Sequence, residues 1–160
     1  MKDLPVYADE LIPLMQALDL GGARVLDLGC GNGGLSRRIA REAAAAHVTG
    51  IDAEAAQIAR AVEKDAPAVF FLQGRGEALP LKTASMDAAI MMKSLHHVPI
   101  PSMDTALAEL ARLLRPGGPI SANPPMRARS TTFCGYFTMK APNAPRRWRR
   151  LSAAWTPGCS

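Results

Sequence analysis

The stretch that decides the fold is RVLDLGCGNGGL, residues 24–35. Residues 24–28 form a short apolar run typical of a buried β-strand, and glycines crowd the positions directly after it. Residues without a Cβ allow a cofactor to approach the backbone of a turn, and the N-terminus of a following helix presents N–H groups there. The stretch therefore predicts a cofactor loop between a strand and a helix. A tight turn without a ligand is the alternative.

Strand-like and helix-like segments alternate along residues 1–120, which is typical of a parallel sheet covered by helices. Besides residues 24–28, the sequence predicts strands at 47–51, 68–72, 87–92 and 120–122. Apolar residues at helical spacing predict helices at 7–18, 35–46, 54–64 and 103–114. The predicted fold is α/β, with a Rossmann-like, doubly wound and mostly parallel sheet of about five strands and helices on both faces.

Two acids near the glycines distinguish between the cofactors that such loops hold. Asp52 ends the second predicted strand, where a carboxylate can accept hydrogen bonds from both ribose hydroxyls of an adenosine. An acid favoured by the N-terminus of the next helix is the alternative for Asp52. Asp27 lies two residues before Gly29 and would repel the pyrophosphate of a dinucleotide. S-adenosylmethionine has no phosphate and carries an ammonium and a sulfonium, so Asp27 favours it over NAD.

Further motifs follow in order along the chain. They are DLGCGNG (27–33), GID (50–52), GRGEALPL (74–81) with SMD (85–87), LHHV (95–98), LAELAR (107–112) and LRPGG (114–118). Together they resemble class I S-adenosylmethionine-dependent methyltransferases, in the small-molecule branch of the quinone-biosynthesis type. The resemblance runs from about residue 4 to residue 120.

The resemblance implies where the methyl donor would bind. Asp27 and the Gly29 carbonyl would hold its methionine end, and Asp52 would hold the ribose. Arg75 stands where the family has an acid that accepts from adenine, and arginine cannot accept a hydrogen bond. Either Glu77 takes that role or backbone amides at Gly76 and Glu77 do, unless Glu77 is a solvated loop acid. The complete predicted cofactor site is Asp27, Gly29, Cys30, Gly31, Asn32, Gly33, Asp52, Ala53, Gly76 and Glu77.

His97 is the candidate catalytic residue, ahead of its neighbour His96. It follows the fourth predicted strand, and ligands gather at the carboxyl edge of an open parallel sheet. A base is needed only if the methyl acceptor must lose a proton, and a packed or donor-facing histidine is the alternative. No metal site is predicted, because the three cysteines are odd in number and widely spaced.

The end of the chain differs sharply from the rest. Residues 121–160 contain six arginines, one lysine and no acid, a net charge of +7, which leaves −2 for residues 1–120 out of a total of +5. We therefore divide the chain into a methyltransferase core (1–120) and a basic Pro/Arg-rich tail (121–160) that is irregular or disordered. The family sheet has seven strands, so the last two are predicted to be missing. A truncation or a shifted reading frame would explain this.

The leading functional hypothesis is methyl transfer from S-adenosylmethionine to a small-molecule acceptor. A donor-binding module or pseudo-enzyme without turnover is one alternative. Another is a nucleic-acid methyltransferase that uses the basic tail, with Trp148 and Trp155 stacking on bases. We do not expect nucleic acid to be the partner, and we expect an unfinished sheet to leave an edge open for self-association.

The sequence also predicts a cytoplasmic protein without a membrane segment. No apolar run approaches the roughly 20 residues that cross a bilayer. The first residues, MKDLPVYADEL, carry acids and a proline where a signal peptide has an apolar core.

Overall fold

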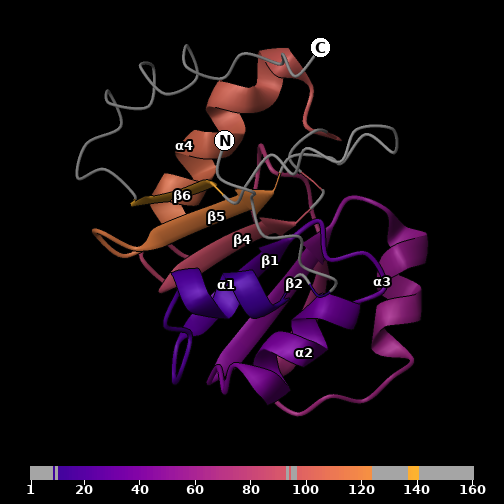
Figure 1. Cartoon of the computed structure of the whole chain (residues 1–160). Helices are drawn as coiled ribbons and strands as arrows, with labels where there is room; N and C mark the ends of the chain where they lie inside the picture. Colours follow the sequence, from indigo (N-terminus) through magenta and orange to yellow (C-terminus); the bar gives the residue numbers. More distant parts are fainter. Residues whose placement is uncertain (1–8, 10, 93, 95–96, 124–136, 141–160) are drawn as a thin grey trace, which may run out of the picture.

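Helices and strands alternate from α1 to β3 in the computed structural model, which describes residues 9, 11–92, 94, 97–123 and 137–140 (Figure 1). The first half of the chain contributes α1 (Leu11–Ala17), β1 (Arg24–Leu28), α2 (Gly34–Glu42), β2 (His47–Asp52), α3 (Ala55–Val62) and β3 (Val69–Gln73). The second half contributes β4 (Ala88–Met92), the 3-10 helix η2 (Ile100–Ser102), α4 (Met103–Leu113), β5 (Pro119–Asn123) and β6 (Phe137–Lys140). The predicted α/β fold is confirmed.

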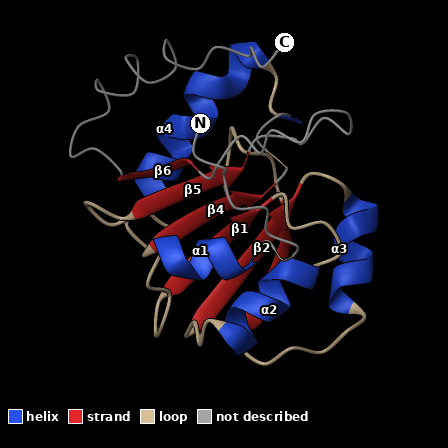
Figure 2. Ribbon diagram, in the orientation of Figure 1, coloured by secondary structure: helices blue, strands red, loops and turns tan. Residues whose placement is uncertain are grey.

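The strands form a single sheet in the order β3-β2-β1-β4-β5-β6 (Figure 2). The five strands β1 to β5 are parallel, and β6 is antiparallel to β5. The chain moves from β1 outward to β3 and then returns to place β4 on the other side of β1. Such a reversal leaves a crevice at the carboxyl ends of the two central strands, where open α/β sheets bind their ligands.

Two apolar clusters cover the two faces of the sheet, because successive side chains of a strand point to opposite faces. On one face, visible in front in Figure 1, α1 and α2 pack on the sheet through Leu11, Leu14, Ile39, Val25, Val48 and Ile90. On the other face, α4 packs through Leu107, Leu110, Leu113, Leu26, Ile51 and Met91. None of the described helices is long and apolar enough to cross a membrane.

Residues 74–87 connect β3 to β4 without a helix, and α4 holds this connection in place. The Arg112 guanidinium donates to the carbonyls of Leu79 and Leu81, at 3.1 and 2.9 Å. The Glu109 carboxylate accepts the Leu79 N–H at 3.0 Å and pairs with Arg112 at 2.8 Å. The hydrogen bond from Arg112 lowers the pKa of Glu109 below its ordinary value. One ion pair on α4 therefore fixes a loop that has little regular structure of its own.

The structure corrects the prediction for the region after residue 120. We expected about five strands and an irregular segment, but β5 extends to Asn123, and residues 137–140 add the antiparallel strand β6. Its sequence, FTMK, is too short to show a period, so its long-range pairing could not be recognised. The outer edge of β5, which we expected to be open, is therefore paired with β6. His96, Cys134, Cys159 and the RRWRR cluster with Trp148 and Trp155 lie outside the described residues.

The Arg112–Glu109 pair, which clamps the connection from β3 to β4 onto α4, leads to a prediction about stability. Arg112→Ala removes the donor for two loop carbonyls and leaves Glu109 without its cation, so we expect the free energy of unfolding to fall by about 1–3 kcal/mol. Urea denaturation at neutral pH measures this loss. Arg41→Ala is the matched control, because the Arg41 side chain is 72% exposed and pairs only with Glu42 among the described residues. Equal free energies of unfolding for the two variants would contradict the role of Arg112 in holding the connection from β3 to β4.

Candidate functional site

The glycine loop turns the chain between β1 and α2, and three of its glycines have positive φ. The φ angles are 80° at Gly29, 54° at Gly31 and 75° at Gly33, in the region that L-residues with a side chain rarely adopt. The Gly29 and Cys30 N–H groups both donate to the Ile51 carbonyl, at 2.7 and 3.1 Å. The loop therefore folds across the carboxyl end of β2, as the predicted cofactor loop requires.

Gly29 lies against a residue that the sequence analysis missed. A Cβ on Gly29 would lie 2.1 Å from Ser94 Cβ, so no side chain fits there. The Ser94 hydroxyl donates to the carbonyl of Leu28, the last residue of β1. Ser94 follows β4 and thus joins the ends of the two central strands. Its position after the fourth predicted strand was the only signal for it.

Asp52 ties the glycine loop to the start of α3. One carboxylate oxygen accepts the Gly31 N–H at 2.9 Å, and the other accepts the Glu54 N–H at 2.9 Å. The acid at the end of β2 therefore has a structural role in the loop. Each oxygen keeps a second lone pair for another donor.

Asp27 is a buried carboxylate in the middle of the sheet, with 1% of its surface exposed. Burial raises the pKa of Asp27 to about 6. The hydrogen bond from Ser36 partly offsets this rise, and the nearby negative charge of Asp52 adds to it. The Ser36 hydroxyl donates to Asp27 Oδ2 at 2.6 Å. No cation pairs with Asp27 among the described residues, so the carboxylate is available to a positively charged ligand.

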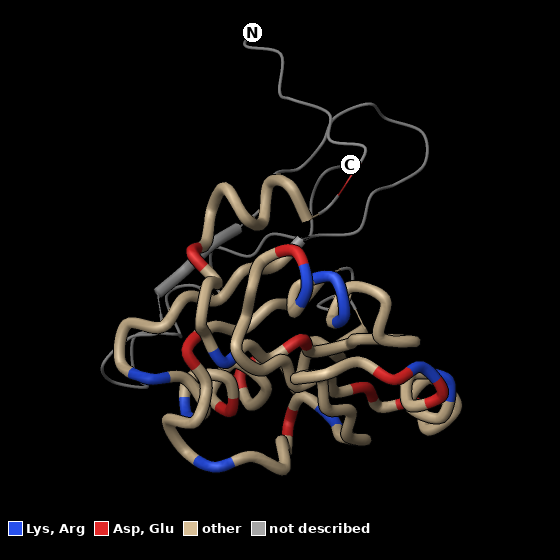
Figure 3. Tube along the Cα trace, turned by 90° about the horizontal axis from the view of Figure 1, so that it is seen from below, with Lys and Arg blue, Asp and Glu red and all other residues tan. Residues whose placement is uncertain are grey.

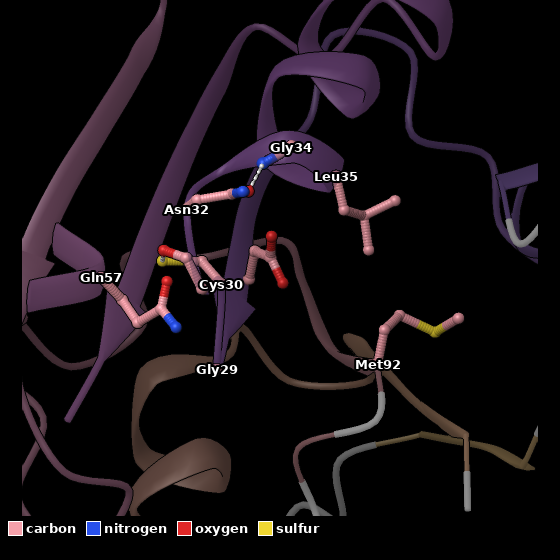
Figure 4. Close-up of a pocket in the computed structure, with 9 residues that line it drawn as sticks. Gly29, Cys30, Asn32, Gly34, Leu35, Gln57 and Met92 are labelled. Carbon is pink, nitrogen blue, oxygen red and sulfur yellow. Dashed lines mark hydrogen bonds between the residues drawn. The ribbon is translucent and has the colours of Figure 1, made fainter. Parts of the chain in front are cut away.

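A cavity of about 320 Å³ opens beside Asp27 at the carboxyl end of β1 (Figure 4). In this view Leu35 and Met92 lie to the right of Cys30, and Asn32 and Gln57 lie to its left. The Asn32 side chain accepts the Gly34 N–H at 3.2 Å. The described residues that line the cavity are Asp27, Gly29, Cys30, Gly31, Asn32, Gly34, Leu35, Gln57 and Met92.

Five of the predicted cofactor residues line this cavity, namely Asp27, Gly29, Cys30, Gly31 and Asn32. Four lining residues were missed. Of these, Met92 could have been inferred as the last residue of a buried strand, whereas Gln57 lies on α3 and depends on how that helix is placed. The remaining predicted residues, Gly33, Asp52, Ala53, Gly76, Glu77 and His97, lie outside the cavity wall.

Gly33, Gly76 and His97 have other surroundings. A Cβ on Gly33 would lie 2.3 Å from the ring of Phe71, so this glycine packs on β3. A Cβ on Gly76 would lie 3.4 Å from Ala106 on α4. His97 is exposed, and its backbone N–H donates to the Ser94 carbonyl at 3.0 Å.

Cys30 is part of the cavity wall and does not have the properties of a nucleophile. Burial raises the pKa of its thiol to about 12, and the Asp27 and Asp52 charges add to the effect. The thiol therefore stays protonated at neutral pH. The described residues contain no cluster of three or more His, Cys, Asp or Glu side chains that could hold a metal ion.

The cavity fits S-adenosylmethionine better than a dinucleotide. Its volume falls in the range of roughly 300–1,000 Å³ that small-molecule sites occupy. A Cβ on Gly31 would meet nothing within 4 Å, so the backbone there faces open space. The described lining residues include a buried carboxylate and no Lys or Arg. This donor set suits a cationic ligand and would repel a pyrophosphate.

Comparison with known proteins identifies the family of this chain. Residues 25–118 match the family described as "Methyltransferase domain". A ubiquinone biosynthesis O-methyltransferase of Xanthomonas oryzae pv. oryzae is 42% identical over 105 residues, which are 63% of this chain and 42% of that protein. A fatty-acid O-methyltransferase of Mycolicibacterium smegmatis is 37% identical over 101 residues, 62% of this chain and 36% of that protein. The chain thus spans less than half the length of these curated relatives.

A solved structure shows the same fold. The S-adenosylmethionine-dependent methyltransferase of Mesorhizobium loti superposes with a TM-score of 0.61 and 29% identity, over 70% of this chain and 52% of that one. The family match covers more than half of this chain, from β1 to the turn before β5, and includes the whole glycine loop. The chain therefore belongs to the methyltransferase domain family, in its class I S-adenosylmethionine-dependent branch.

Proposed function

We propose that this chain transfers the methyl group of S-adenosylmethionine to a small-molecule acceptor. The observation that carries the proposal is the buried Asp27 carboxylate, which lines a cavity bounded by the glycine loop and has no cation of its own among the described residues. A methyl donor with an ammonium group supplies that cation. When bound, the donor would contribute a methyl group already activated by its sulfonium.

Residues that line the cavity, together with predicted residues outside its wall, would divide the donor between them. Asp27 would bind the ammonium, while Gly29, Cys30, Gly31 and Asn32 would contact the donor through the loop backbone. The second lone pairs of the Asp52 carboxylate would accept the ribose hydroxyls. By resemblance, the adenine would lie near Ala53, Gly76 and Glu77. Gln57 extends from α3 into the same cavity and would contribute an amide.

We take the acceptor to be a hydroxyl compound, because both curated relatives are named O-methyltransferases. A hydroxyl must lose its proton when it is methylated, so a base is needed near the carboxyl end of β4. His97 is our candidate, since it is exposed and follows Ser94 at that edge. The protein mainly has to align this hydroxyl with the donor and exclude water.

A small acceptor agrees better than a nucleic acid with the surface of the described residues. Acidic and basic residues are interspersed along the trace, without a long stretch of one sign (Figure 3). A nucleic-acid site would require a basic face. We also propose a cytoplasmic location, which the free, buried thiol of Cys30 supports.

Binding of the product analogue tests the donor site. S-adenosylhomocysteine should raise the melting temperature of the protein, because a ligand that binds only the folded state stabilises it. Asp52→Ala removes the ribose acceptor and the loop anchor, so we expect affinity to fall at least about 10-fold by calorimetry. Glu63→Ala, at an exposed acid beyond α3, is the control and should bind as the wild type does. No thermal shift at saturating ligand would refute the proposed function.

Asp27→Asn should have opposite effects on stability and on binding. The pKa of Asp27 is about 6 in the folded protein, against an ordinary value of 3.8, so the folded state becomes less stable as pH rises from about 4 to 6. Asparagine removes this penalty. We expect a gain in unfolding free energy that grows over that range and reaches up to about 3 kcal/mol above pH 6.

The same substitution should weaken S-adenosylhomocysteine binding at least about 10-fold, since the ammonium loses its carboxylate. For the wild type, affinity should fall as the pH drops below about 6, because Asp27 becomes protonated. Asp19→Asn, at an acid in the exposed turn before β1, serves as the control. Unchanged affinity in Asp27→Asn would show that the carboxylate does not contact the donor.

His97→Gln separates catalysis from donor binding. If His97 is the base, kcat should fall by about 100-fold or more, while the Kd for S-adenosylhomocysteine stays the same. Transfer of a labelled methyl group to catechol, as a probe acceptor, measures kcat. His47→Gln is the control, because His47 begins β2 at the opposite end of the strands. An unchanged kcat in His97→Gln would favour a packed or donor-facing role.

A further inference from the structure

Arg37 on α2 bridges two elements that form walls of the cavity. One terminal nitrogen donates to the Asn32 carbonyl in the glycine loop at 2.7 Å. The other donates to the Ala61 carbonyl near the end of α3 at 3.1 Å. A guanidinium has donors in a rigid planar fork, so one side chain can bond both carbonyls at once.

The two carbonyls matter because of what lies next to them. Asn32 lines the cavity, and Ala61 lies one turn after Gln57, which lines the cavity from α3. The Ala61 carbonyl is among the last four of its helix, which have no partner within the helix. A cation at this end is also favoured by the helix dipole. Arg37 therefore satisfies the end of α3 and holds it against the loop.

Phe71 of β3 limits how far Arg37 and the loop can move. The guanidinium carbon lies 5.7 Å from the centre of the Phe71 ring, within the range of a cation–π contact. The same ring fills the space beside two glycines, since a Cβ would lie 2.3 Å from it at Gly33 and 2.7 Å at Gly50. The loop thus rests on an aromatic ring that also fixes the arginine.

The geometry points to Arg37 as a positioning residue for the methyl donor. It holds the glycine loop and α3 at the separation that the bound donor requires, although it does not line the cavity itself. This inference rests on the proposed donor site. Among the described residues, the next residue, Arg38, pairs with Asp9 and Glu42, at 2.7 and 2.8 Å, and neither of these partners lines the cavity. Substitutions at these two neighbouring arginines can therefore distinguish an effect on donor positioning, at Arg37, from a general effect on the stability of α2, at Arg38.

The test compares Arg37→Ala, Arg37→Lys and Arg38→Ala in the full chain. We expect Arg37→Ala to weaken S-adenosylhomocysteine binding about 10-fold or more by calorimetry. Arg37→Lys keeps the charge but lacks the planar fork whose two terminal nitrogens reach the two carbonyls, so its affinity should be intermediate. Arg38→Ala should bind within about twofold of the wild type, although it loses two ion pairs. The melting temperature without ligand gives the stability of each variant.

Hydrogen exchange without ligand provides a second readout. Arg37→Ala should speed exchange in both residues 29–34 and residues 55–62, whereas Arg38→Ala should leave both segments as in the wild type. Either of two results would overturn the inference: affinity in Arg37→Ala within twofold of the wild type, or full recovery in Arg37→Lys, which would assign the effect to charge alone. If the wild type fails to bind, the proposed function is wrong, and exchange still tests the bridge itself.

Discussion

The contact on which the site depends is the one between the Asp52 carboxylate and the Gly31 N–H, at 2.9 Å. A loop with several glycines loses much conformational freedom when it becomes ordered, so it needs partners outside itself. Asp52 provides one of them from the end of β2, and through the Glu54 N–H it also fixes the start of α3. The Ile51 carbonyl and Ser94 add contacts from β2 and from beyond β4. The conformation of the glycine loop, and with it the shape of the cavity, therefore depends on contacts from residues outside the loop.

Asp27 shows how the site differs from an ordinary core. A fully buried carboxylate destabilises the folded protein at neutral pH, which is why its pKa is raised to about 6. One hydroxyl, from Ser36, pairs with it, and no cation does so among the described residues. A group with this perturbation in a cavity is typical of a functional site. A cationic ligand would relieve this destabilisation, so the same carboxylate lowers the stability of the free protein and favours binding of the donor.

The strands from β1 to β5 and most of the helices were predictable, because hydrophobic runs and helical spacing are local properties of the chain. Asp27, Gly29, Gly31 and Asn32 were predictable as cavity residues for a similar reason, since they lie within one strand–loop–helix unit. The strand β6 was missed because four residues carry no detectable period. Gln57, which lines the cavity, and Ser94, which lies against Gly29, were missed because they belong to other parts of the chain.

The sequence by itself determined the alternation of strands and helices, the glycine loop at the end of β1 and the acids beside it. These follow from side-chain periodicity and from the need for residues without a Cβ. Only the tertiary structure decided what each glycine is for. Gly29 and Gly31 both line the cavity, and Gly29 also lies against Ser94, whereas Gly33 packs against Phe71 outside the cavity wall. The physical reason is that these neighbours come from β3 and from beyond β4, and their positions are set by the packing of the whole sheet.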